Sequence, residues 1–264
     1  MPDIYVYSGD ANMRMNNEAS WTAARDVATA ETIDTTSTAF SAGIREARTS
    51  NGIGHTIRRY YLAVDTSGIT VKPESATLKI YGYTNAGSNL IAVKVSQSAT
   101  GDAETDFVAS DYGKIDFNTT YSAEYTGTWS TTGYNEFVLN DDALTEMLNF
   151  DSIKIAVIGH DYDYLNVTPA AGFTRTSGFY PATATDVNTR PLISYVAGTI
   201  PPPVPSGSFA KDYTINTYNI DVLSVQYDKD DNVDQVPFFL GVPGPARLRG
   251  RENAPITSTG KKKN

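Results

Sequence analysis

The chain has 264 residues and no cysteine, which excludes a disulfide framework, a thiolate metal site and a cysteine nucleophile. It is rich in tyrosine, threonine, serine and glycine, a mixture that favours short strands and turns over helices and predicts an all-β protein. The formal net charge of −9 is uneven: from residue 245 onward the chain carries +5, so residues 1–244 carry −14 and disfavour binding to nucleic acid.

The N-terminal stretch MPDIYVYSGD has no basic region followed by an apolar run. No stretch of the sequence approaches the ~18 apolar residues that a membrane-spanning helix needs. We therefore expect a soluble protein, without a membrane partner, that is made in the cytoplasm.

Short alternating segments, broken by clusters of Gly, Asn, Asp, Ser and Thr, continue from Ile4 to Val196. The clearest predicted strands are residues 56–64, 75–84, 90–97, 134–140, 152–159 and 190–198. Leu78 and Ile80 alternate with polar residues, and Ile153, Ile155 and Val157 repeat the pattern, so each strand is expected to bury one face. Residues 141–149, DDALTEMLN, predict one helix with aspartates in its first turn. The pattern predicts an antiparallel, jelly-roll-like β-sandwich.

A proline-rich segment, TIPPPVPSGS, follows the last predicted strand of the sandwich. Its four prolines have no backbone N–H group and fix φ. We therefore expect a stiff, extended segment in the polyproline II conformation, followed by a short flexible stretch that contains glycine and serine. The sequence thus predicts three parts: a sandwich over residues 1–198, a linker over 199–208 and a C-terminal segment over 209–264.

The C-terminal segment is predicted to form a β-hairpin around the acidic turn DKDDN. It is too short to bury its own apolar residues dependably, so we expect it to dock on a partner or to form an oligomer. Three alternating arginines in ARLRGR would share one side of an extended chain. The candidate docking residues are Val222, Val225, Phe238, Phe239, Leu240, Arg247, Arg249 and Arg251.

Several sequence segments of the predicted sandwich together resemble a known type of module. These are YSGDANMRM with Trp21 downstream, RRYYLAVDTSGI, ESATLKIYGY, WSTTGYNEFVLN and RPLISYVAG. Over residues 3–198 they resemble a β-sandwich module of the DNRLRE or carbohydrate-binding-like type. The resemblance carries no catalytic motif and implies a structural protein of a phage virion.

Two stretches of the sequence contain residues of the types that bind metal ions. DKDDNVD begins like a calcium loop, but Val233 replaces the glycine at position six and Phe239 replaces the glutamate at position twelve. In GHDYDYLN, alternation would send Asp161 away from His160 if the preceding strand continues, and the only other histidine, His55, is expected in a separate turn. We therefore predict an acidic hairpin turn, a loop histidine, and neither a metal ion nor a cofactor.

The aromatic side chains allow two interpretations. Rings with polar tips suit stacking on sugars, whereas cross-strand packing is the commoner use of tyrosine in a sheet. The candidates are Tyr60, Tyr61, Tyr81, Tyr83, Tyr112, Tyr121, Tyr125, Trp129, Tyr134, Tyr162, Tyr164 and Tyr180.

No nucleophile elbow, phosphate-binding loop or dinucleotide fingerprint is present in the sequence. We therefore expect a non-enzymatic virion protein, an accessory, decoration or fibre component of a capsid or tail, which contacts other capsid or tail subunits. The alternative is a carbohydrate-binding module that meets a host glycan on a surface assembly.

Overall fold

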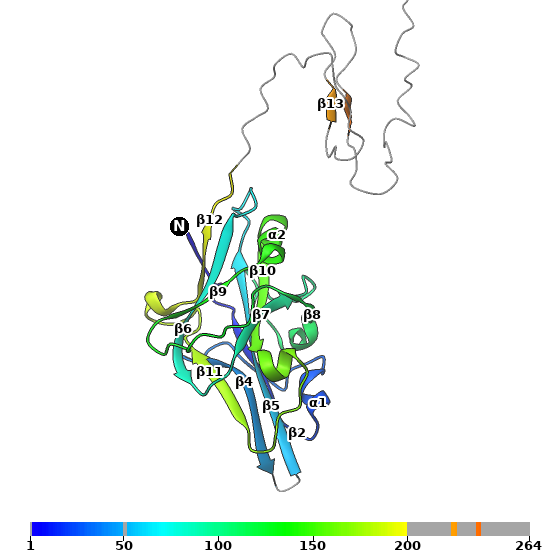
Figure 1. Ribbon diagram of the computed structural model, residues 1–264, viewed down its shortest axis with the longest axis vertical. Helices are drawn as coiled ribbons and strands as arrows, with labels where there is room; N and C mark the ends of the chain where they lie inside the picture. Colours follow the sequence, from blue (N-terminus) through cyan, green and yellow to red (C-terminus); the bar gives the residue numbers. More distant parts are fainter. Residues whose placement is uncertain (1, 50–51, 200–222, 226–235, 239–264) are drawn as a thin grey trace, which may run out of the picture. The chain divides into compact units, whose positions relative to one another are not determined.

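The computed structural model describes residues 2–49, 52–199, 223–225 and 236–238 (Figure 1). The strands are β1 (Asp3–Tyr5), β2 (Ala11–Glu18), β3 (Thr32–Asp34), β4 (Phe40–Thr49), β5 (Gly52–Asp65), β6 (Ser75–Asn85), β7 (Leu90–Val95), β8 (Ile115–Thr120), β9 (Tyr134–Val138), β10 (Ser152–Gly159), β11 (Thr174–Phe179), β12 (Leu192–Val196), β13 (Leu223–Val225) and β14 (Val236–Phe238). The helices are α1 (Trp21–Arg25) and α2 (Asp141–Asn149), with short turns η1 (Ala109–Lys114), η2 (His160–Tyr164) and η3 (Val187–Thr189).

The strands β1 to β12 pair antiparallel in the order β1-β12-β6-β11-β4-β5-β10-β7-β8, with β9 on β6, β2 on β5 and β3 on β2. Strand β6 belongs to two layers. Residues 75–81 pair with β12 and β9, whereas residues 82–85 pair with β11. The prediction of an all-β, sandwich-like fold is confirmed, and the finer jelly-roll comparison stays a prediction.

Two hydrophobic clusters lie on opposite faces of β5 and β10. Tyr60 and Leu62 of β5 point into one cluster, whereas Tyr61 and Ala63 point into the other. This division follows directly from the alternation of side chains along a strand. Trp21 of α1 belongs to the second cluster, and α1 lies beside β2 and β5 (Figure 1).

The expectation that the strand at residues 152–159 buries one face is wrong. Every residue of β10 is buried, because the strand lies between β5 and β7 and has a hydrophobic cluster on each side. Ile155 and Val157 enter one cluster, and Ala156 and Ile158 enter the other. Even Lys154 is buried, and its ammonium group donates hydrogen bonds to the carbonyl oxygens of Gln97 and Ala99, at 3.2 and 2.8 Å.

Strands β4 and β10 share one edge of β5, because β2 occupies the opposite edge over an overlapping range. At Gly43, strand β4 passes from one hydrophobic cluster to the other, and the φ of +130° at this residue is favourable only for glycine. A Cβ atom at this position would collide with the carbonyl oxygen of Arg175. Gly43 therefore allows β4 to leave the first cluster, which contains Ala42, and to place Ile44 in the second.

The predicted helix at residues 141–149 is confirmed as α2. Asn140 caps it, since its side-chain oxygen accepts a hydrogen bond from the Ala143 amide at 3.1 Å. Asp141 and Asp142 occupy the first turn, where the helix dipole favours negative charge.

Contacts within the chain divide it into Met1–Pro202 and Pro203–Asn264. In the second part, β13 and β14 pair antiparallel, with Leu223 opposite Phe238, at the place where the sequence predicts a hairpin. The linker and the rest of the C-terminal segment lie outside the described residues, so the three-part organisation stays a prediction. Within the described residues, no helix has the length and apolar character required to cross a membrane.

Candidate functional site

Four tyrosines from three segments form a continuous line on the layer of β6 and β9. We call these four residues the tyrosine row. It consists of Tyr134 of β9, Tyr81 and Tyr83 of β6, and Tyr180, which follows β11. The ring centroids of Tyr134 and Tyr81 are 5.3 Å apart, those of Tyr81 and Tyr180 5.9 Å, and those of Tyr180 and Tyr83 5.5 Å, each pair edge to face. These separations are typical of favourable aromatic contacts.

The sequence places these rings together through strand register. Tyr81 is the cross-strand partner of Tyr134, and the Tyr180 amide donates to the Tyr81 carbonyl oxygen at 3.1 Å. Tyr83 lies two residues beyond Tyr81, so the two side chains share one face of β6. Gly82 between them is buried, and a Cβ atom there would collide with the backbone of Ser130.

Hydrogen bonds fix two of the four rings. The Tyr81 hydroxyl donates to the Thr132 carbonyl oxygen at 2.6 Å, and the Tyr134 hydroxyl donates to the Arg190 carbonyl oxygen at 3.0 Å. Burial, with smaller effects of nearby groups such as Tyr5, raises the pKa of Tyr134 to about 12, so its ring stays neutral at physiological pH. Tyr83 is 50% exposed and presents much of its ring to solvent.

A groove of about 540 Å³ begins at one member of the row, Tyr180. Most of the side chains that line it carry a hydroxyl group. They are Thr35, Thr36, Ser37, Thr38, Tyr180, Thr183, Ala184, Thr185, Asp186 and Thr189. The groove therefore offers an aromatic ring at one point, many hydroxyl groups that both donate and accept hydrogen bonds, and the carboxylate of Asp186.

Two aspartates hold the groove loops in shape. The side chain of Asp34 accepts hydrogen bonds from the amides of Thr36 and Ser37, at 3.0 and 2.9 Å. Although burial alone would raise it, the hydrogen bonds from Ser37 and Thr36 lower the pKa of Asp34. Asp186 caps η3 by accepting from the Asn188 amide at 2.9 Å. Hydrogen-bonded turns thus hold the backbone of the groove walls.

The other aromatic candidates mostly pack in the interior. Tyr60, Tyr61, Tyr112 and Tyr121 are fully buried, and Trp129 is buried as well. Packing is therefore the role of these five rings, as the cross-strand interpretation expects.

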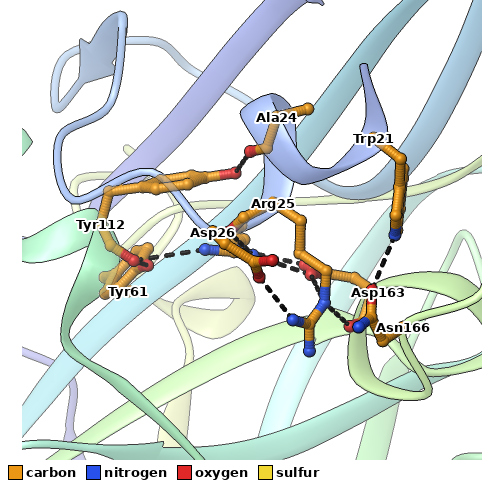
Figure 2. Close-up of polar contacts among 9 residues, drawn as sticks. Trp21, Ala24, Arg25, Asp26, Tyr61, Tyr112, Asp163 and Asn166 are labelled. Carbon is orange, nitrogen blue, oxygen red and sulfur yellow. Dashed lines mark hydrogen bonds and ion pairs between the residues drawn. The ribbon is translucent and has the colours of Figure 1, made fainter.

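The structure also contains a buried polar network that the sequence did not indicate (Figure 2). Arg59 and Asp163 are fully buried, and two guanidinium nitrogens of Arg59 donate to the two carboxylate oxygens of Asp163, each at 2.8 Å. Arg25 of α1 donates to the Asp163 carbonyl oxygen at 2.6 Å. Although burial alone would lower it, Asp163 raises the pKa of Arg59 well above its usual value.

The network ties together segments that are distant in the chain. Figure 2 shows the Trp21 ring directed at Asn166, a contact of 2.9 Å, and the Tyr112 hydroxyl directed at the Ala24 carbonyl oxygen, also at 2.9 Å. The guanidinium carbon of Arg59 lies 4.1 Å from the Tyr112 ring centroid. Because the charges are paired and away from solvent, we interpret this network as a structural clamp and not as a reactive site.

Asp10 is a second buried acid outside the groove lining. One of its carboxylate oxygens accepts hydrogen bonds from the Tyr60 hydroxyl at 2.7 Å and the Ala182 amide at 2.9 Å. Its other oxygen, Oδ1, is buried without a hydrogen-bond partner. Burial raises the pKa of Asp10 to about 7, against the opposing effect of these two hydrogen bonds.

One of the two histidines, His160, lies outside the strands as predicted, and the other does not lie where the sequence placed it. His55 is a buried residue within β5 and contacts the Trp21 ring, so its expected position in a turn is wrong. Strand β10 ends at Gly159, and His160 begins the turn η2. Alternation therefore does not separate His160 from Asp161, and their side chains lie 3.1 Å apart.

The candidate docking residues are almost all beyond the described part of the chain. Val225 lies in β13 and Phe238 in β14, but their side chains are not described. Val222, Phe239, Leu240, Arg247, Arg249 and Arg251 lie outside the described residues, as does the DKDDNVD turn. Their docking role stays a prediction.

A comparison of the sequence with protein-family models gives no match, and a comparison with curated proteins gives none either. The resemblance to DNRLRE or carbohydrate-binding-like modules is therefore neither supported nor refuted. What the structure itself identifies is an all-β, sandwich-like fold that carries a tyrosine row beside a hydroxyl-lined groove.

Proposed function

We propose that this protein is a non-enzymatic module that binds carbohydrate along the tyrosine row and the adjoining groove. The observation that carries the proposal is the position of Tyr180, which is both a member of the row and part of the groove wall. A sugar ring has an apolar face and a rim of hydroxyl groups. The first suits an aromatic platform and the second suits the threonines of the groove.

The composition of the groove supports binding without hydrolysis. A glycosidase places two carboxyl groups across the bond that it cleaves, about 5–10 Å apart. Among the described residues that line the groove, Asp186 is the one with a carboxylate, and it is engaged in capping η3. The groove thus offers hydrogen bonds and stacking but lacks a paired acid and base.

Replacing Tyr83 by alanine is expected to weaken glycan binding about tenfold, because the variant loses the most exposed ring of the row. Glycan array screening of the intact chain identifies the sugar, and titration calorimetry of the variants measures the affinity. Phe150→Ala is the matched control, since this ring at the end of α2 is 40% exposed and belongs to neither the row nor the groove. The proposal is wrong if the intact chain gives no saturable signal on the array, or if the two variants bind equally.

The expected setting is a phage virion, in which the sandwich is displayed and the C-terminal segment attaches it to capsid or tail subunits. The pairing of β1 with β12 brings the first and last strands of the sandwich into one sheet. This supports only the part of the proposal in which the sandwich is a separate unit, because such a unit can be carried on an attached segment.

Deleting residues 209–264 is expected to leave a sandwich that melts cooperatively but does not co-sediment with the assembled particle. Changing Arg247, Arg249 and Arg251 together to glutamate should weaken attachment more at low salt than at high salt, because salt screens exposed charges. The amount of each variant that co-sediments with purified particles measures both effects. Full incorporation of the shortened chain would place the attachment site in the sandwich instead.

A further inference from the structure

Three side chains with metal-binding atoms, none of which lines the groove, converge at the end of β10. They are Glu124, in the segment between β8 and β9, and His160 and Asp161, at the start of η2. His160 Nδ1 lies 3.1 Å from Asp161 Oδ1 and 3.4 Å from Glu124 Oε2. The ligand atoms of the three residues all lie within 4.8 Å of one another.

The backbone at the start of β7 positions all three side chains. The His160 amide donates to the Asn89 carbonyl oxygen at 2.8 Å, and the Tyr125 amide, next to Glu124, donates to the Leu90 carbonyl oxygen at 2.8 Å. The Asn89 side-chain amide donates to Asp161 Oδ2 at 3.2 Å. Asn89 and Leu90 thus hold the backbone at His160 and beside Glu124, and Asn89 also holds the Asp161 side chain.

The His160 ring is held from its other side as well. It stacks on Tyr164, one turn later in η2, with ring centroids 5.7 Å apart and planes inclined by 21°. This stacking fixes the plane of the imidazole, so that Nδ1 faces the two carboxylates. A fixed ring plane is a usual requirement of a histidine ligand.

The charges of the cluster are not balanced by the histidine. Nδ1 carries at most one proton, so it can donate one good hydrogen bond, yet two carboxylates approach it. Two carboxylates so close to each other repel unless a cation lies between them. We propose that Glu124, His160 and Asp161 bind a divalent transition-metal ion, of which Zn²⁺ and Mn²⁺ are the best matches.

The distances agree with this assignment. Zn²⁺ binds imidazole nitrogen and carboxylate oxygen at about 2.0–2.2 Å, so two ligands of a tetrahedral site lie about 3.4 Å apart. The two separations at His160 Nδ1 are 3.1 and 3.4 Å. The side chains are 17%, 28% and 45% exposed for His160, Glu124 and Asp161, which leaves room for water to complete the coordination. A nitrogen ligand favours a transition metal over Ca²⁺, which takes six to eight oxygens.

A bound ion would join the segment that contains Glu124 to η2. Both segments lie at the same end of β7 and β10. The ion would therefore stabilise this end of the sandwich, and its water-filled positions could accept an oxygen from a ligand. The site shares no residue with the groove, so the inference does not depend on carbohydrate binding.

The test uses the full chain, freed of metal with EDTA and dialysed. Titration calorimetry with ZnCl₂, MnCl₂ and CaCl₂ measures stoichiometry and affinity, and thermal melting measures stabilisation. We expect one Zn²⁺ or Mn²⁺ ion per chain, an increase in melting temperature and at least tenfold weaker binding of Ca²⁺. X-ray absorption at the zinc edge should show one imidazole among the ligands.

The chain has two histidines, which gives a matched pair of variants. His160→Gln is expected to weaken binding at least tenfold, whereas His55→Gln should retain it. Glu124→Gln provides a second test if His160→Gln does not fold, since Glu124 is partly exposed. Absence of saturable Zn²⁺ and Mn²⁺ binding overturns the proposal. Binding that survives both His160→Gln and Glu124→Gln also overturns it, because the ion would then occupy another acidic segment such as the one at residues 228–234.

Discussion

Replacing Arg59 by glutamine is expected to lower the free energy of unfolding by about 3–5 kcal/mol, because the buried Asp163 carboxylate loses its closest charged partner and keeps only the more distant Arg25, whose Nε lies 3.7 Å from Oδ1. Asp163 would lose both of its 2.8 Å hydrogen bonds from the guanidinium group while remaining fully buried. Urea denaturation followed by circular dichroism measures the change, provided that the m value stays constant.

Arg58→Gln is the matched control, since Arg58 is the adjacent residue of the same strand. Its side chain is half-buried and donates to the Ser41 hydroxyl at 2.9 Å. Burial and the nearby positive charges of Arg14 and Arg45 lower the pKa of Arg58, so its charge is poorly accommodated. We expect this substitution to change stability by about 0.5 kcal/mol or less.

A double variant separates the cost of an unpaired charge from the value of the pair itself. Arg59→Met with Asp163→Leu should recover most of the stability that Arg59→Gln loses, because apolar side chains of similar volume often replace a buried ion pair without loss. Equal destabilisation by Arg59→Gln and Arg58→Gln would show that the network is not a clamp.

Raising the pH from 4 to 8 is expected to destabilise the protein through Asp10. In the folded state burial raises the pKa of this carboxyl from 3.8 to about 7, so the folded protein holds a proton that the unfolded chain releases. The contribution of Asp10 to the free energy of unfolding is therefore fully present below pH 4 and decreases as the pH rises towards 7. Above pH 7 this contribution is lost, and the free energy no longer changes through Asp10. At 1.36 kcal/mol per pKa unit the total effect is at most about 4 kcal/mol.

The variant Asp10→Asn should remove this pH dependence, because the amide has no proton to lose. The exposed Asp151→Asn serves as the control and should keep the wild-type profile. Free energies of unfolding at half-unit steps between pH 4.5 and 8 are the measurement. This pH window excludes the contributions of four other aspartates to the pH dependence of stability. Their pKa values are lowered in the folded state, so they change stability at lower pH; they are Asp34, Asp65, Asp102 and Asp116. Parallel profiles for the wild type and Asp10→Asn would contradict the assignment.

The candidate sites show how far sequence reasoning reaches. The tyrosines of the row were visible in the sequence as possible sugar platforms, and Tyr81 and Tyr83 share a face by simple alternation. Nothing in the sequence indicated that Tyr134 and Tyr180, about 50 and 100 residues later, would join them. The groove was not predicted at all, because the residues that line it come from separate loops and share little beyond the hydroxyl group that most of them carry.

The sequence by itself determined the all-β class, the six clearest strands and helix α2, because these depend on local patterns of alternation, propensity and capping. Contacts between segments that are distant in the sequence decided the other features of the fold and of the candidate sites. Strand β10 is buried on both faces because of its neighbours β5 and β7, and Glu124 meets His160 because both pack against the start of β7. Arg59 becomes buried because Asp163, more than 100 residues away, supplies its counter-charge. Such contacts join distant segments, so only the tertiary structure could reveal them.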